Sequence, residues 1–122
     1  MAKKQGILII DDSKETVAGL KAYLGKKYHV LTAYNGRNGM KKYDKNESRI
    51  HLVLTDLILP DAIGSYLISS IKEKTPDKPV IAMTGWEGDP AEGFETNSNA
   101  DLLLKKPFEL EQLDQAIEKF LS

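Results

Sequence analysis

Five short apolar runs punctuate the chain. Each run is only three or four residues long, which is too short for a helix, and most are continuously apolar instead of alternating with polar residues. Runs of this kind are typical of strands with both faces covered, as in a parallel sheet between layers of helices. The runs predict strands at 7–10, 30–33, 52–55, 80–83 and 102–104.

Helical periodicity fills the segments between these runs. In three of them, apolar residues recur every three or four positions, as expected for helices that pack one face against a sheet. We predict these helices at 14–24, 62–74 and 109–121. Strands that alternate with helices, through connections that suit right-handed crossovers, indicate a doubly wound α/β domain with a parallel sheet between helical layers.

Two further helices have weaker signals. Asn35 is suited to cap a helix that starts near residue 36, although Gly36 and Gly39 lower the helix propensity there. Residues 89–99 begin with an aspartate and a proline, as many helices do, but they contain a single large apolar side chain, Phe94. We therefore predict five strands and five helices, with the fourth helix held only loosely to the core.

The charge balance narrows the range of partners. The chain has 122 residues, with 17 Lys and Arg against 18 Asp and Glu, so it lacks the basic excess that most nucleic-acid-binding proteins have. The lysine pairs, among them Lys41-Lys42, are scattered between acids, and we interpret most of them as solvated faces. We expect one domain over residues 1–122 that makes no direct contact with nucleic acid.

The composition excludes further classes of protein. There is no cysteine, which rules out a disulfide framework, a thiolate metal site and a cysteine nucleophile, and two histidines are too few for a multi-histidine metal centre. No apolar run is long enough to span a bilayer, and the first residues lack the apolar core of a signal peptide. We expect a cytoplasmic protein without membrane contacts.

Polar residues follow four of the five predicted strands. The carboxyl ends of parallel strands share one edge of the sheet, where ligands bind in open α/β folds. The residues expected at this edge are Asp11, Asp12, Asp56, Thr84 and Lys106. A single aspartate often caps a helix, but three carboxylates in one place repel one another, and a cation relieves that repulsion.

This set of groups fits phosphoryl chemistry. Carboxylate ligands, with water in the remaining positions, suit Mg²⁺. The ammonium of Lys106 and the hydroxyl of Thr84 can contact further oxygens of a phosphoryl group. Asp56 can itself be the nucleophile, because carboxylates form aspartyl phosphates. The residues therefore predict a site for Mg²⁺ and phosphate at the carboxyl edge of the sheet.

The same residues also belong to a set of motifs. The set comprises the acidic pair Asp11-Asp12, the segment 52–61 around Asp56 with Gly64 after it, the hydroxyl residue Thr84, and Lys106-Pro107-Phe108. Over its whole length the chain resembles the receiver domain of two-component response regulators, in which these motifs occur in this order and at similar spacings. The resemblance implies a flavodoxin-like, three-layer α/β/α fold with strand order 2-1-3-4-5.

The resemblance also implies a role for each site residue. Asp56 would accept a phosphoryl group from a sensor histidine kinase or a His-phosphotransfer protein. Asp12, Asp56 and the backbone carbonyl of Ile58 would ligate Mg²⁺, and Asp11 would contribute mainly through water. Lys106 would pair with the phosphoryl group. Such a domain catalyses only its own phosphorylation and slow autodephosphorylation, so we do not expect an enzyme in the usual sense.

Readout of phosphorylation would involve residues after the fourth and fifth strands. Thr84 would move toward the phosphoryl group, and Pro107 would follow Lys106 through a bond that is often cis in this family. The family usually has an aromatic switch residue where this chain has Leu103, so the usual coupling of hydroxyl and aromatic ring is absent. A downstream output protein or domain, or a second phosphorylated copy, would bind the surface formed by the fourth helix, the fifth strand and the fifth helix.

Two other functions remain open at this point. A degenerate receiver would bind partners without being phosphorylated, and Leu103 together with the unusual fourth helix keeps this alternative open. A phosphohydrolase would use Asp56 as its nucleophile, but such enzymes typically need a second aspartate two positions later, where this chain has Ile58. A phosphorylation experiment distinguishes the three hypotheses.

Overall fold

A computed structural model describes residues 4–85 and 99–121 and shows a central parallel sheet. Its five strands are β1 (Gly6–Ile10), β2 (His29–Ala33), β3 (Ile50–Asp56), β6 (Val80–Thr84) and β7 (Leu102–Lys105). They lie in the order β2-β1-β3-β6-β7, and every pair is parallel. Numbered along the chain, these strands have the order 2-1-3-4-5, which confirms the expected flavodoxin-like topology.

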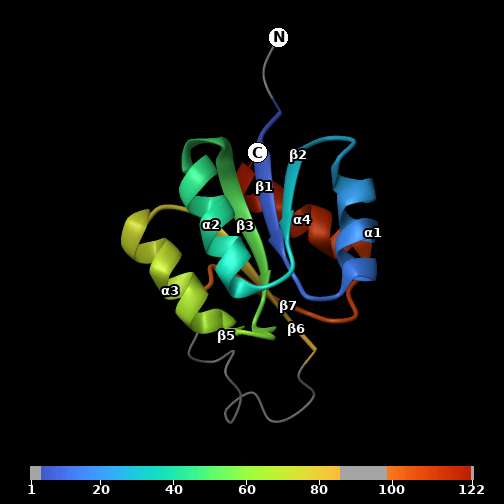
Figure 1. Cartoon of the computed structure of the whole chain (residues 1–122). Helices are drawn as coiled ribbons and strands as arrows, with labels where there is room; N and C mark the ends of the chain where they lie inside the picture. The colour runs from blue at the N-terminus through green and yellow to red at the C-terminus, as the bar shows by residue number, and fades with distance from the viewer. Residues whose placement is uncertain (1–3, 86–98, 122) are drawn as a thin grey trace.

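Four α-helices cover the sheet within the described residues (Figure 1). They are α1 (Lys14–Leu24), α2 (Gly36–Asn46), α3 (Gly64–Lys74) and α4 (Leu110–Leu121), and a short 3-10 helix, η1 (Glu47–Arg49), follows α2. The helices α1 and α4 pack on one face of the sheet, and α2 and α3 pack on the other. None of these helices has the length and hydropathy that a membrane span requires.

The hydrophobic core lies in two layers, one on each face of the sheet. Successive side chains of a strand point to opposite faces, so Ile7 and Ile9 of β1 pack toward α1 and α4, whereas Leu8 and Ile10 pack toward α2 and α3. Every residue of β1 and of β6 is buried. Burial on both faces explains why these strands read as continuous apolar runs in the sequence.

A small hairpin replaces the beginning of one predicted helix. Strand β4 (Ile58–Leu59) pairs antiparallel with β5 (Ala62–Ile63), and α3 starts only at Gly64. The predicted helix start at residue 62 is therefore wrong, because the backbone of residues 62 and 63 joins the hairpin. The other three helices start within one residue of their predicted positions. The helix expected at 89–99 lies, except for its last residue, outside the described residues.

Hydrogen bonds at its start compensate for the low helix propensity of α2. Asn35 caps the helix, because its Oδ1 accepts a hydrogen bond from the Asn38 amide at 2.7 Å. The carboxylate of Asp61, in the hairpin turn, accepts hydrogen bonds from the amides of Gly36 at 2.7 Å and Arg37 at 3.0 Å. These two bonds lower the pKa of Asp61, since they favour its charged form. The hairpin thereby anchors α2 beside the carboxyl edge of the sheet.

Candidate functional site

Neighbouring strand ends bring the expected polar groups to one edge of the sheet. Asp11 directly follows β1, Asp56 ends β3, Thr84 ends β6, and Lys106 directly follows β7. These four strands are consecutive neighbours in the sheet, so the four residues lie along its carboxyl edge. Asp12 follows Asp11 and joins the group. The structure brings together all five residues that the sequence indicated for this edge, and their roles remain predictions.

Three carboxylates form the centre of this site. One carboxylate oxygen from each of Asp11, Asp12 and Asp56 lies within 4.8 Å of the others. Asp11 is fully buried, Asp56 is partly buried and Asp12 is exposed. Within the described part of the chain, the Asp12 carboxylate makes no hydrogen bond or ion pair. It is therefore open to a ligand that approaches from solvent.

Backbone amides orient the other two carboxylates. Oδ1 of Asp11 accepts a hydrogen bond from the Ser13 amide at 2.9 Å, and Oδ1 of Asp56 accepts one from the Ile58 amide at 3.0 Å. In both cases the donor is two residues further along the chain, which is the local pattern that aspartate favours in turns. The second oxygen of each carboxylate is left for contacts with other elements.

Lys106 occupies those second oxygens. Its Nζ lies 2.6 Å from Oδ2 of Asp11 and 2.9 Å from Oδ2 of Asp56. Burial lowers the pKa of the Lys106 ammonium, but its hydrogen bonds to the two aspartates and their negative charge outweigh burial, so the pKa is raised above the ordinary 10.5. Lys106 is therefore charged at neutral pH and bridges two of the three carboxylates.

The charge balance of the site fits a divalent cation. Three carboxylates face a single ammonium among the described residues, so an excess of negative charge remains. The donors are all hard oxygen atoms, and Asp12, which has no protein partner here, is exposed. Magnesium prefers such oxygen ligands and keeps several waters. The residues present therefore fit Mg²⁺.

Thr84 is buried at the end of β6, next to the site. Its backbone carbonyl accepts a hydrogen bond from the Lys106 amide at 2.6 Å, which connects the ends of β6 and β7. The peptide bond between Lys106 and Pro107 is cis, as the resemblance implied. This hydrogen bond links the backbone of Thr84 to that of Lys106, which follows the strand that carries Leu103.

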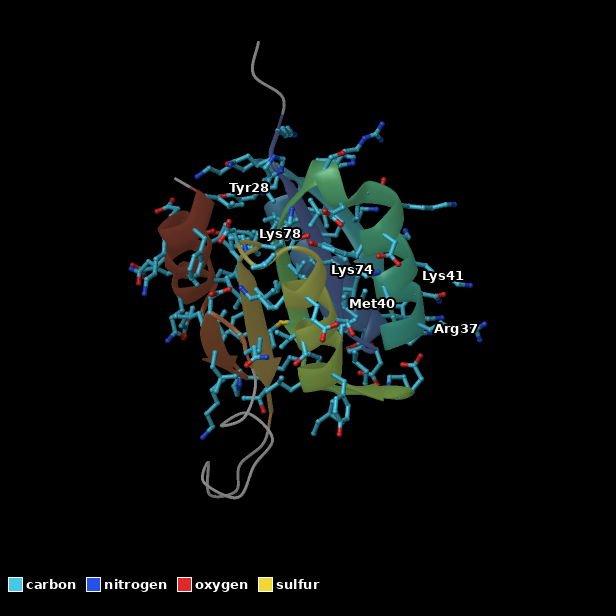
Figure 2. All side chains as sticks on the ribbon, turned by 90° about the vertical axis from the view of Figure 1, so that its left-hand side faces the viewer. Tyr28, Arg37, Met40, Lys41, Lys74 and Lys78 are labelled. Atoms are coloured by element: carbon cyan, nitrogen blue, oxygen red, sulfur yellow. The ribbon has the colours of Figure 1, made fainter. Side chains whose placement is uncertain are left out.

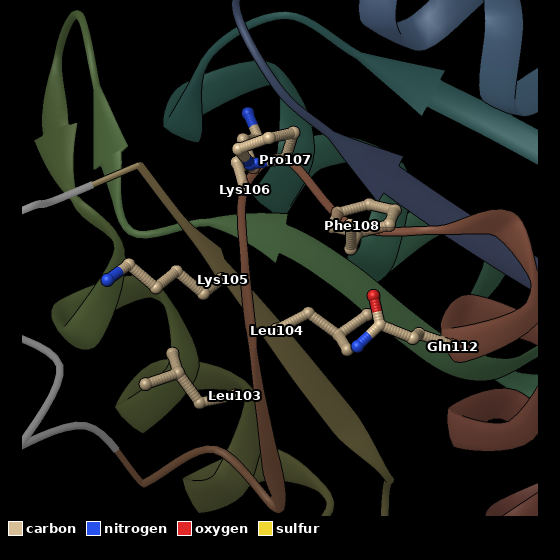
Figure 3. Close-up of a pocket in the computed structure, with 7 residues that line it drawn as sticks. All are labelled: Leu103, Leu104, Lys105, Lys106, Pro107, Phe108 and Gln112. Atoms are coloured by element: carbon tan, nitrogen blue, oxygen red, sulfur yellow. The ribbon is translucent and has the colours of Figure 1, made fainter.

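Leu103 lies on β7, at the edge of the sheet, and its side chain is 44% exposed. Figure 3 shows Leu103 and Lys105 on one side of β7 and Leu104 on the other, as strand alternation requires. A pocket of about 500 Å³ extends from Leu103 along β7 to Pro107 and Phe108. The position of the usual aromatic switch is thus an exposed aliphatic surface in this chain.

Sequence reasoning did not single out two aspartates that position the site's surroundings. Asp61 anchors α2, as described above. Oδ2 of Asp101, just before β7, accepts hydrogen bonds from Lys72 Nζ at 2.6 Å and from the Val80 amide at 2.8 Å. A polar residue directly before a predicted strand is a weak signal, because solvent-exposed loops give the same pattern. Long-range partners of this kind are visible only in the fold.

Comparison with known proteins identifies the family. The chain matches the response regulator receiver domain model over residues 7–118. It is 33% identical to "Histidine kinase P4" of Formosa agariphila, over 98% of this chain and 9% of that protein. It is 32% identical to "Transcriptional regulatory protein CiaR" of Streptococcus pneumoniae, over 94% of this chain and 50% of that protein. The chain thus spans half or less of these two curated relatives.

Solved structures give the same result. A response regulator receiver domain protein from Clostridium thermocellum superposes with a TM-score of 0.87 at 30% identity, and the match covers 96% of this chain and 94% of that one. The BeF3-activated DrrB receiver domain superposes with a TM-score of 0.82 at 30% identity, over 97% of each chain. Since the family match includes every strand end that forms the site, the chain belongs to the response regulator receiver domains, the phosphorylation-dependent signalling domains of two-component systems.

Proposed function

We propose that this domain is a signalling switch in which Asp56 accepts a phosphoryl group. The observation that carries the proposal is the setting of the Asp56 carboxylate. One of its oxygens lies 2.9 Å from the Lys106 ammonium, and the carboxylates of Asp11 and Asp12 are its immediate neighbours. A nucleophile, a fixed cation and a cluster of oxygen ligands are the groups that phosphoryl transfer to a carboxylate needs.

The donor in this proposal is a phosphohistidine of a sensor histidine kinase or a His-phosphotransfer protein. A carboxylate oxygen of Asp56 attacks the phosphorus, a P–O bond forms, and the P–N bond breaks. The imidazole of the donor leaves with the bonding electron pair and takes up a proton. Lys106 stabilises the negative charge on the phosphoryl oxygens during transfer, because its ammonium is already held beside Asp56.

Mg²⁺ is the cofactor that the acidic cluster supports. Asp12, Asp56 and the backbone carbonyl of Ile58 would hold the ion, and Asp11 would act mainly through bound water. When bound, the ion supplies positive charge beside the transferring group. The relative described as BeF3-activated supports a phosphoryl-binding role, because BeF3 has the shape and charge of a phosphoryl group.

The phosphoryl group changes the charge at Asp56 from −1 to about −2. Lys106 bridges Asp56 and Asp11, so its hydrogen bonds redistribute when one partner becomes larger and more negative. Its backbone amide is bonded to Thr84, which carries the change into β6 and β7. The output surface then comprises β7 with Leu103, Pro107 and α4. A downstream output protein or domain, or a second phosphorylated copy, binds there.

Incubation with Mg²⁺ and acetyl phosphate, followed by intact-mass spectrometry, tests the proposal. We expect the mass of one added phosphoryl group, its loss in Asp56→Asn, and no loss in Asp77→Asn, a matched change of an exposed aspartate outside the site. Absence of labelling with every phosphodonor would support the degenerate receiver. Rapid multiple turnover of acetyl phosphate would support a phosphohydrolase.

A further inference from the structure

Helix α2 concentrates positive charge on the surface of a nearly neutral chain. Its exposed cations are Arg37, Lys41, Lys42 and Lys45. Its single acid, Asp44, forms an ion pair with Lys74 of α3. Figure 2 shows Arg37 and Lys41 extending from α2 away from the sheet. The interpretation of Lys41-Lys42 as a plain solvated face is therefore incomplete, because the fold gathers these lysines with two further cations.

This arrangement has a cost for the isolated helix. Arg37, Lys41 and Lys45 follow one another at intervals of four residues, so each lies one turn from the next on the same side of α2. Like charges at this spacing destabilise a helix. Asp44 is the only acid on α2 and is paired with Lys74, and Asp61 of the hairpin turn lies beside Arg37, at one end of the row. An anionic partner would relieve the repulsion along the row.

A groove of about 450 Å³ lies between α2 and the strand β2. Leu31, Thr32 and Ala33 of β2 line one side, and Lys41, Lys42 and Lys45 line the other. Every charged side chain of the groove, within the described part of the chain, is a lysine. The lining charges of the groove therefore favour a negatively charged ligand.

Strand β2 also offers unpaired backbone groups beside this groove. It is an edge strand of the described sheet and pairs only with β1. The His29 amide donates to Gln5 O at 2.9 Å and the Ala33 carbonyl accepts from Asp11 N at 3.1 Å, so the odd-numbered residues of β2 face β1. Because backbone direction alternates along a strand, Val30 and Thr32 direct their N–H and C=O groups outward.

We propose that an extended acidic segment of a partner protein binds here, adding as a strand to the edge of β2 with its acids facing the lysines of α2. The spacings agree: residues four apart on a helix are separated by about 6 Å along its axis, and residues two apart on a strand are separated by about 6.8 Å. Acids at every second position of the segment can therefore lie opposite lysines that are four residues apart on α2. A nucleic acid would use the lysines but leave the outward backbone groups of β2 unpaired.

A fluorescein-labelled peptide with the sequence Thr-Glu-Val-Glu-Val-Glu-Val-Thr is the probe, and its affinity for the full chain is measured by fluorescence anisotropy. We expect binding that weakens with salt and is about tenfold weaker in the Lys41→Glu/Lys45→Glu double variant. The matched control, Lys26→Glu/Lys119→Glu, makes the same charge change at exposed lysines outside the groove and should keep the affinity. Equal weakening in both double variants would overturn the proposal.

Peptide isomers test the strand geometry separately from the charge. An isomer with its three glutamates in a row has the same net charge and should bind more weakly, because only alternate residues face α2. Two further peptides are N-methylated, one at every glutamate and the other at every valine, which removes the N–H donors of those residues. Only one of these two sets of amides can face β2, so one peptide should bind and the other should not. Binding of both methylated peptides, or tighter binding of an equally charged single-stranded DNA or of anionic lipid vesicles, would overturn the proposal.

Discussion

The ammonium of Lys106 lies 2.9 Å from Oδ2 of Asp56, although the strands that carry them are separated in the sheet by β6. The same ammonium lies 2.6 Å from Asp11, which is fully buried. One cation thus holds together carboxylates at the ends of two adjacent strands, and its own strand ends two positions further along the sheet. We therefore expect both the stability of the domain and the proposed phosphoryl transfer to depend on this one side chain.

The charge of Lys106 gives the first prediction. Its pKa is raised in the folded state, so the ion pairs stabilise the fold fully below the unfolded-state pKa, near 10.5, and this stabilisation is lost as the pH rises through the folded-state pKa. In Lys106→Met, without Mg²⁺, the free energy of unfolding at neutral pH should fall by about 2 kcal/mol, because buried Asp11 loses its partner.

Urea denaturation across the alkaline range checks this prediction. The free energy of unfolding of the wild type should fall more steeply above pH 10.5 than that of Lys106→Met, which has no ammonium left to titrate. Both proteins contain the same tyrosines and other lysines, so these groups cancel in the comparison. Parallel curves for the two proteins would show that the Lys106 bridge does not stabilise the fold.

Asp12 gives a prediction in which the stability of the metal-free protein and the effect of Mg²⁺ change in opposite directions. Its exposed carboxylate repels two neighbouring ones and has no cationic partner among the described residues. Asp12→Asn should therefore raise the melting temperature of the metal-free protein by about 3 °C. The same change removes the negative charge of a proposed Mg²⁺ ligand, so added Mg²⁺ should raise the melting temperature less than in the wild type. A variant that is less stable without metal would contradict the repulsion argument.

Gly39 tests how closely α2 packs on the sheet. A Cβ at this position would lie 2.7 Å from Cδ1 of buried Ile10, so Gly39→Ala should destabilise the fold by about 1–2 kcal/mol, although alanine has the higher helix propensity. The double variant with Ile10→Val lacks the clashing methyl group. It should cost less than the sum of the single variants in thermal denaturation. A stabilising Gly39→Ala would show that propensity dominates at this position.

Asp101 tests whether an aspartate outside the site can stabilise the fold without affecting phosphorylation. Asp101→Ala removes the hydrogen bonds from Lys72 and from the Val80 amide, so we expect a loss of about 1–2 kcal/mol in chemical denaturation. Phosphorylation by acetyl phosphate at a temperature where the variant is folded should stay close to the wild-type level, because Asp101 lies at the opposite end of β7 from the site. Full stability in Asp101→Ala would mean that solvent replaces both contacts without cost.

The strands and the polar edge of the sheet could be predicted from the sequence, for identifiable reasons. Burial on both faces leaves a continuous apolar run, as in β1, and the residue that ends such a run must lie at the edge. This pattern predicts the edge positions of Asp11, Asp56 and Lys106. It does not predict the direct bridge from Lys106 to Asp11, because side-chain partners far apart in the sequence depend on the final packing.

The hairpin after β3 shows where local patterns mislead. Ala62 and Ile63 fit the apolar spacing of the following helix, and a hairpin with two residues in each strand is too short to leave an alternating pattern. The anchoring of α2 by Asp61 follows from that hairpin and was equally hidden. In both cases the decisive partner comes from another element, which a one-dimensional pattern does not contain.

Mapping the phosphoryl group to a residue is the most direct test of the central claim. The domain is phosphorylated with acetyl phosphate and Mg²⁺, the acyl phosphate is reduced with borohydride, and the digested protein is sequenced by tandem mass spectrometry. We predict that the reduced residue is Asp56 alone, and that omission of Mg²⁺ abolishes the signal. Modification at Asp11 or Asp12 in place of Asp56, or labelling that does not need Mg²⁺, would contradict a site in which Asp56 is the acceptor and its neighbours hold the metal.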